Sequence, residues 1–143
     1  MKIEYIKGDL MKAPEKYIAH GCNAKGVMGS GVAKLIRAKW PDAYDHYRYT
    51  HETFRLIPGR AYFVECGDKT IINCITQESY GRDGRQYADY GLIIKAIQGI
   101  SEVISDTPVA LPMIGAGLGG GDWNKIEEII EEHSTFQPRV YQL

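Results

Sequence analysis

Two glycine-rich stretches contain the residues of this sequence best suited to binding phosphate. Residues 26–31 read Gly-Val-Met-Gly-Ser-Gly, and residues 115–121 contain five glycines. Glycine lets another group approach the backbone closely, and the free N–H groups at the start of a helix attract anions. Each stretch is followed by a helical pattern. We therefore expect the two loops to hold one ligand that carries two phosphates; the alternative is a pair of turns that bind nothing.

Four side chains near these loops have acid–base chemistry: Asp9, His20, Glu78 and Asp122. His20 lies three residues before Asn23, at the end of a predicted strand. Histidine titrates near neutral pH, which suits a general acid, base or nucleophile acting on a phosphoryl group. A strand-end histidine satisfied by main-chain hydrogen bonds is the other interpretation, and both stay open at this point. Asp9 and Asp122 are interpreted as a turn residue and a helix N-cap.

Nucleotide-cofactor and metal motifs fit this sequence poorly. Gly115-x-Gly117-x-x-Gly120 has the spacing of a dinucleotide fingerprint, but that fingerprint needs an acidic residue near the end of the next strand, which here reads Val-Tyr-Gln over residues 140–142. No glycine is followed by Lys-Ser or Lys-Thr, as a P-loop requires. The three cysteines form no Cys-x-x-Cys, and the four histidines form no i,i+4 pair. We expect no cofactor and no metal.

Composition limits the class of protein. The 143 residues are enough for one domain with a substantial core, and we expect residues 1–143 to form that single domain. The formal net charge of −1 gives no general basic field for nucleic acid, which is not expected as a partner. No apolar run approaches the roughly 20 residues that span a bilayer, and the N-terminus is charged rather than signal-like. We expect a cytoplasmic monomer with no membrane partner.

Hydrophobic periodicity predicts strands interleaved with helices, in the order β-β-α-α-β-β-α-β-α-β. The predicted strands are residues 2–6, 17–22, 61–66, 70–75, 108–114 and 139–143. This order predicts an α/β fold in which helices cover both faces of a central mixed sheet. Ligands of such sheets bind beyond the carboxyl ends of the strands, and both glycine loops fall there.

Two further predictions concern single segments. Tyr44, Tyr47, His51 and Phe54 recur at spacings of three, four and three on one face of a predicted helix, and this stripe is interpreted as core. Residues 76–87 are polar and long for a connection between a strand and a helix. Such a connection is typically a functional lid or a disordered segment.

Four motifs resemble those of the macrodomain family and occur in the same order. They are Gly8-Asp9-Leu10, His20-Gly-Cys-Asn23, Gly29-Ser-Gly-Val-Ala33 and Pro112-Met-Ile-Gly-Ala-Gly117. Ser79-Tyr80-Gly81, Trp123 and the Val-Tyr-Gln-Leu of residues 140–143 are similar to the small stand-alone ADP-ribose-1''-phosphate phosphatases of this family. The resemblance implies a three-layer α/β/α domain that removes the terminal phosphate from ADP-ribose-1''-phosphate. The alternatives are a hydrolase acting on mono-ADP-ribosylated protein or nucleic acid, and an ADP-ribose reader without catalysis.

The resemblance also implies contacts for the two ends of ADP-ribose. Asp9 would accept a hydrogen bond from the adenine amine, a role that replaces the structural one given above. Leu10 would contact the adjoining ring nitrogen through its main chain, and Tyr141 would pack beside adenine. Asn23 would reach the distal ribose, and Tyr80 would cover it.

Between these ends, the resemblance implies that backbone N–H groups hold the diphosphate. The residues concerned are Ser30, Gly31, Val32, Gly115, Ala116, Gly117 and Leu118. Catalysis would fall to His20 and Asn23. A related branch of the family uses a lysine and an aspartate at positions that Gln77 and Gly119 occupy here, so a covalent lysine mechanism is not expected. Gly119 is instead grouped with the ligand-binding loop.

Overall fold

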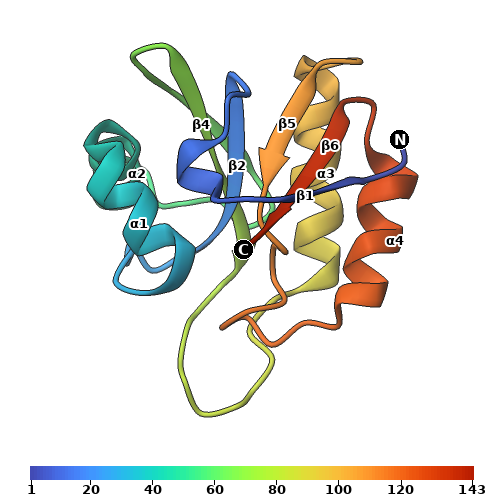
Figure 1. Ribbon diagram of the computed structural model, residues 1–143. Helices are drawn as coiled ribbons and strands as arrows, with labels where there is room; N and C mark the ends of the chain where they lie inside the picture. The colour runs from blue at the N-terminus through green and yellow to red at the C-terminus, as the bar shows by residue number, and fades with distance from the viewer.

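The computed structural model describes residues 1–143 and contains one six-stranded sheet (Figure 1). The strands are β1 (Glu4–Lys7), β2 (Tyr17–Asn23), β3 (Ala61–Cys66), β4 (Lys69–Gln77), β5 (Pro108–Leu111) and β6 (Gln137–Gln142). They lie in the order β1-β6-β5-β2-β4-β3. Every neighbouring pair is parallel except β3 with β4, so the predicted mixed sheet is confirmed.

Four helices cover the sheet, two on each face. Helices α1 (Gly31–Lys39) and α2 (Pro41–Thr53) lie on one side, and α3 (Tyr90–Val103) and α4 (Trp123–His133) lie on the other (Figure 1). A short 3₁₀ helix, η1 (Leu10–Lys12), joins β1 to β2 and is the one element that periodicity did not predict. The expected α/β/α layers and the order of the elements are confirmed. None of the helices has the length and apolar character needed to cross a membrane.

The core lies on both faces of the sheet. On the α3 and α4 side, the buried cluster includes Ile93, Ile97, Ile100, Ile126, Ile130 and Phe136. On the α1 and α2 side, it includes Ile18, Ile36, Trp40, Ala43 and Ile71. Strand β4 is covered from both sides, and residues 70–76 are all buried. A strand covered on both faces reads as a near-continuous apolar run, which is why its position was predictable.

The aromatic stripe predicted on α2 is only partly buried. Tyr47 is fully enclosed, whereas the side chain of Phe54 is 72% exposed. Helix α2 ends at Thr53, and Phe54 follows it with non-helical φ and ψ of −123° and −11°. Because the helix ends one residue before Phe54, helical spacing no longer predicts which way the Phe54 side chain points. The prediction that Phe54 belongs to the core was wrong.

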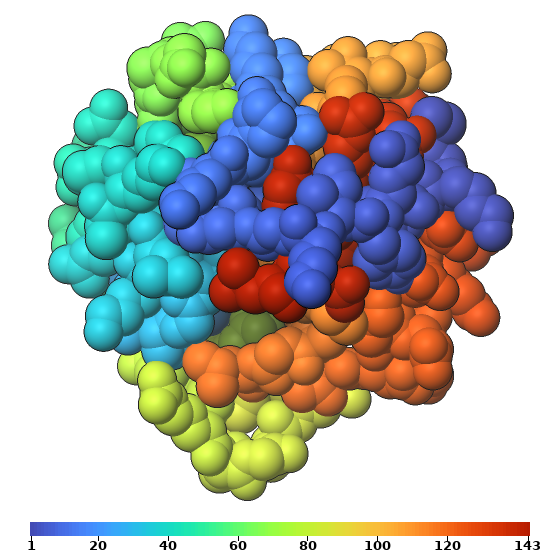
Figure 2. All heavy atoms as spheres, in the orientation of Figure 1, coloured from blue at the N-terminus to red at the C-terminus, as the bar shows by residue number.

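Three parallel strands end at the same edge of the sheet. After β2, β4 and β5 the chain continues into residues 24–30, 78–89 and 112–122. Strand β5 stops at Leu111, earlier than predicted, because the chain turns at once: the N–H of Ile114 donates to the carbonyl of Pro112 at 2.7 Å. Figures 1 and 2 show these connections and the start of α1 gathered at the lower end of the molecule.

Candidate functional site

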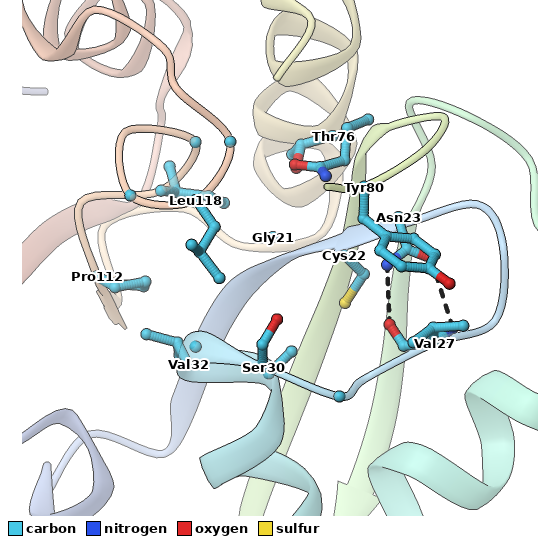
Figure 3. A pocket seen from close by; sticks show the side chains of 18 of the residues that line it. Gly21, Cys22, Asn23, Val27, Ser30, Val32, Thr76, Tyr80, Pro112 and Leu118 are labelled. Atoms are coloured by element: carbon cyan, nitrogen blue, oxygen red, sulfur yellow. Dashed lines mark hydrogen bonds between the residues drawn. The ribbon is translucent and has the colours of Figure 1, made fainter. Parts of the chain in front are cut away.

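The two glycine loops meet at one cavity of about 760 Å³ (Figure 3). Residues from the ends of β2 and β4 and from the loops around α1, β4 and β5 line it: Gly21, Cys22, Asn23, Val27, Gly29, Ser30, Gly31, Val32, Ala33, Thr76, Gln77, Tyr80, Gly81, Arg82, Pro112, Met113, Ile114, Gly115, Gly117, Leu118 and Gly119. A Cβ added to Gly31 would lie 3.4 Å from Cδ1 of Leu118, so the loops touch. The structure thus confirms the prediction that the two loops lie together at one site.

The first loop presents the start of α1 to the cavity. Ser30 is the N-cap residue, yet its side chain makes no capping hydrogen bond, and Figure 3 shows its hydroxyl pointing between the two loops. Gly31 has φ of +61°, a conformation that other residues adopt only at a cost. The first N–H groups of a helix have no partner within the helix. Residues 30–32 therefore offer anion-binding groups on one wall.

The second loop is folded by hydrogen bonds of its own backbone. The N–H of Gly121 donates to Gly115 O at 2.8 Å, and that of Gly120 donates to Gly117 O at 3.0 Å. The N–H of Ala116 donates to Met113 O at 3.1 Å, and Ala116 does not line the cavity. The N–H group of Ala116 thus has a partner within the loop, and its contact with a phosphate stays a prediction.

The same loop is joined to residues 78–89 through a single carbonyl. Gly119 O accepts hydrogen bonds from the N–H groups of Tyr87 and Ala88, at 2.8 and 2.9 Å. At the other end of the segment, the N–H of Ala24 donates to the carbonyls of Gln77 and Glu78, at 3.0 and 3.3 Å. The long connection is thus tied to both neighbouring loops. Tyr80, Gly81 and Arg82 of this segment line the cavity, and its action as a lid stays a prediction.

Asn23 lies at the cavity wall and organises the first loop. Its Nδ2 donates to Val27 O at 2.8 Å (Figure 3). Its Oδ1 accepts from Lys25 N at 2.9 Å. The hydroxyl of Tyr47 lies 2.6 Å from Asn23 O and 2.9 Å from Asn23 Oδ1. The amide thus fixes the turn that leads to Gly29. A contact between Asn23 and a ribose stays a prediction.

Tyr47→Phe is expected to lower the free energy of unfolding by about 1–2 kcal/mol, because the buried oxygens of Asn23 lose a hydrogen-bond donor. Urea denaturation measures this change. Tyr49→Phe is the matched control, since Tyr49 lies on the same helix with its side chain 59% exposed. Equal midpoints for the two variants would contradict the proposed anchoring of the loop.

His20 does not reach the cavity. Its side chain is 0% exposed, and Nε2 lies 2.6 Å from Oδ1 of Asn73. Asn73 in turn donates through Nδ2 to the carbonyl of Ala43 in α2, at 3.0 Å. Burial lowers the pKa of His20 to about 4, so the ring is neutral at pH 7. These contacts favour the interpretation of His20 as a buried, hydrogen-bonded histidine, with a side-chain partner in place of the main chain. They argue against direct attack or proton transfer by His20, and its catalytic role stays a prediction.

The residues expected at adenine also lie outside the cavity. Oδ1 of Asp9 accepts from Met11 N at 2.9 Å and caps η1, as the first interpretation of Asp9 held. Leu10 is buried in the α1 and α2 cluster. The hydroxyl of Tyr141 donates to Oε1 of Glu15 at 2.5 Å. Val32 packs against the same cluster as Leu10 and Tyr141 and also lines the cavity. Adenine contacts of Asp9, Leu10 and Tyr141 stay predictions.

The cavity contains few groups that titrate. None of the lining residues is a carboxylate, a histidine or a lysine, and Arg82 is the only one with a charged side chain. Burial raises the pKa of the Cys22 thiol well above its usual value, so the thiol stays protonated. No group of three or more His, Cys, Asp or Glu side chains is placed to hold a metal ion. The chemistry on offer is therefore mainly that of backbone N–H groups and one guanidinium.

Sequence reasoning assigned no ligand role to Thr76 or Arg82. Thr76 lies at the end of β4 with a buried hydroxyl that has no hydrogen-bond partner in the protein. Thr76 directly follows the apolar residues of this strand, so the sequence pattern did not indicate a ligand role for its hydroxyl. Arg82 belongs to a segment without periodicity, and only the path of the chain from Gln77 to Tyr87 brings it to the cavity.

Comparison with known proteins gives a consistent result. A family model described as Macro domain matches residues 19–130. The chain is 28% identical to the ADP-ribose 1''-phosphate phosphatase of Candida albicans, over 97% of this chain and 98% of that protein. It is 31% identical to the DNA ADP-ribosyl glycohydrolase of Mycobacterium bovis over 88% of this chain, but the match covers 37% of that protein. The solved macrodomain of Mycobacterium tuberculosis DarG has a TM-score of 0.83 and 25% identity, covering 99% of this chain and 97% of that one.

Proposed function

This chain belongs to the macro domain family, and on that premise we propose that it binds ADP-ribose and removes the terminal phosphate from ADP-ribose-1''-phosphate. The observation that carries the proposal is the meeting of two glycine loops at one cavity. A relative that matches over nearly the whole of both chains is named for this phosphatase activity. The cavity volume of about 760 Å³ lies within the range of small-molecule sites.

The diphosphate would lie between the loops, held by backbone N–H groups. Residues 30–32 approach it from the start of α1, and Gly117, Leu118 and Gly119 approach it from the other side. A helix N-terminus and a glycine loop that face each other present donors and positive partial charge to one anion. The distal ribose would then fall toward Asn23 and Tyr80, which line the opposite end of the cavity from Pro112 (Figure 3).

The reaction would proceed without a carboxylate, histidine or lysine side chain in contact with the substrate. In ADP-ribose-1''-phosphate the phosphate is attached to the anomeric carbon, C1''. If the C1''–O bond breaks, the electron pair leaves with phosphate, water bonds to C1'', and the water proton passes to the departing phosphate. Phosphate is a leaving group that needs no general acid, and the transition state is oxocarbenium-like, as in glycoside hydrolysis. Fixed N–H donors stabilise the departing charge.

The direct test is release of inorganic phosphate from ADP-ribose-1''-phosphate in isotopically labelled water. We expect the wild-type protein to release unlabelled phosphate, because the water oxygen bonds to C1''. A variant with a blocked cavity, Gly117→Glu, is the blank for contaminating phosphatases. Label in the phosphate would contradict cleavage at C1'', whereas no release at all would contradict the phosphatase itself.

An ADP-ribose reader is the second candidate, and the absence of carboxylate, histidine and lysine from the cavity lining favours it. Calorimetry that gives tight binding of ADP-ribose, together with no turnover of ADP-ribose-1''-phosphate or of mono-ADP-ribosylated DNA and protein, would establish this alternative. A glycohydrolase that depends on a lysine is disfavoured, because Gln77 stands at the corresponding place and its Nε2 donates to Ser79 O at 2.6 Å.

A further inference from the structure

A second, smaller hollow adjoins the cavity. Its volume is about 250 Å³, and it is lined by Gly81, Arg82, Gly84, Arg85, Gly117, Leu118 and Gly120. The hollow and the main cavity adjoin each other, because they share four lining residues: Gly81, Arg82, Gly117 and Leu118. Four of the seven lining residues are glycines, two are arginines, and none has a carboxylate. A space of this kind suits a small, highly charged anion.

The two arginines of this hollow differ in their partners. Nη2 of Arg85 lies 2.8 Å from Oδ2 of Asp83, and the same carboxylate accepts a hydrogen bond from Tyr87. The charge of Arg85 is therefore largely compensated. Arg82 takes part in none of the ion pairs or side-chain hydrogen bonds of the structure. It supplies the one uncompensated positive charge at the point where the two spaces meet.

Arg82 lies near the end of the cavity where we expect the distal ribose of the ligand. It follows Tyr80 by two residues, and Tyr80 lies in front of Asn23 in the view of Figure 3. The diphosphate would already be satisfied by the loops at residues 30–32 and 117–119. A further phosphate on the distal ribose would extend past Tyr80 and needs a positive charge of its own.

We propose that the hollow at Arg82 binds the terminal phosphate of ADP-ribose-1''-phosphate and so selects the phosphorylated substrate over ADP-ribose. This inference rests on the proposed function, because it assigns a site to the group that is removed. Bidentate recognition by a guanidinium suits a phosphate dianion. Glycines 81, 84 and 120 let the anion approach the main chain.

The test compares two ligands in two arginine variants. We expect Arg82→Gln to raise KM for ADP-ribose-1''-phosphate by tenfold or more, because a charged hydrogen bond to the terminal phosphate is lost. The Kd for ADP-ribose, measured by calorimetry, should change less than twofold. Arg60→Gln is the matched control, since Arg60 is an exposed arginine outside both spaces. Arg82→Lys should recover part of the loss, because it keeps the charge but not the planar fork.

Each outcome decides between the inference and the function on which it rests. An equal effect of Arg82→Gln on both ligands, or no effect on either, would overturn the assignment of the terminal phosphate to this hollow. If the wild-type protein released no phosphate, the phosphatase proposal would fail. The same comparison then uses binding alone: tenfold tighter binding of ADP-ribose-1''-phosphate than of ADP-ribose, lost in Arg82→Gln, supports the site, and equal binding rejects it.

Discussion

Gly117→Glu is expected to lower the affinity for ADP-ribose by at least a hundredfold while leaving thermal stability nearly unchanged. A Cβ added at Gly117 would meet no protein atom within 4 Å, and the residue has no positive φ, so the fold should accept a side chain there. The residue lines both the cavity and the hollow beside it. A carboxylate at this point would occupy the space of the diphosphate and repel it. Losing two charge-assisted hydrogen bonds, at about 1.5–3 kcal/mol each, accounts for a change of this size.

Calorimetric titration with ADP-ribose and a thermal unfolding curve are the two measurements. Gly117→Val separates bulk from charge, and should weaken binding less than Gly117→Glu. Gly99→Ala is the control for glycine replacement in general, because Gly99 lies within α3 and a Cβ there would make only an ordinary contact with Ala61 at 3.7 Å. If Gly117→Glu folded normally and still bound ADP-ribose with wild-type affinity, the assignment of the diphosphate to these loops would be wrong.

Acidification is expected to cost the folded protein about 3 kcal/mol through His20 alone. Burial lowers the pKa of His20 from 6.5 to about 4 in the folded state. Above pH 6.5 the ring is neutral in both states, and it contributes no pH dependence. Between pH 6.5 and about 4 the unfolded chain binds a proton that the folded protein excludes, so stability falls as the pH falls. At 1.36 kcal/mol for each pH unit, the loss is complete near pH 4.

Urea midpoints measured from pH 7.5 to pH 4 give this slope. His20→Gln should flatten the profile between pH 6.5 and pH 4, because glutamine can donate to Asn73 but does not titrate. An NMR titration of the His20 ring in the wild-type protein measures the same property without a variant. A ring that protonates near pH 6.5 would show that His20 is accessible, and would reopen the catalytic role that the structure argues against.

The layers of the fold and the meeting of the two loops could be predicted because both follow from rules about chain direction. Strands β2 and β5 are parallel, so the loops that follow them must lie at one edge of the sheet. Glycine clusters then mark where a ligand approaches the backbone. The sheet order itself needed the structure, since β1 pairs with β6 at the far end of the chain.

His20 shows why proximity along the sequence was insufficient. It lies two residues before Cys22 on β2, on the same face of the sheet, because side chains alternate along a strand. The Sγ atom of Cys22, which lines the cavity, lies 3.7 Å from Nε2 of His20, so the His20 ring packs directly behind the cavity wall. Periodicity identifies the face but not the depth at which helices cover it. The depth depends on Asn73 and Ala43, which come from other parts of the chain.

Asp9 and Tyr141 illustrate a different limit. Family resemblance assigned them to adenine, whereas the structure gives each side chain a partner within the protein, Met11 N for Asp9 and Glu15 for Tyr141. Glu15 is buried and also pairs with Arg139 at 3.1 Å. No local pattern in the sequence indicates this pairing, because its members lie more than a hundred residues apart. Their contact with adenine stays a prediction.

The carbonyl of Gly119 has a mechanical consequence for how ligands enter and leave. The Gly119 carbonyl accepts hydrogen bonds from the N–H groups of both Tyr87 and Ala88. An outward movement of residues 78–89 would therefore break two hydrogen bonds to the glycine loop that contains Gly117. We therefore expect the two segments to move together when a ligand enters or leaves. Entry by the opposite rim, formed by residues 27–31, leaves those bonds intact and is the less costly route.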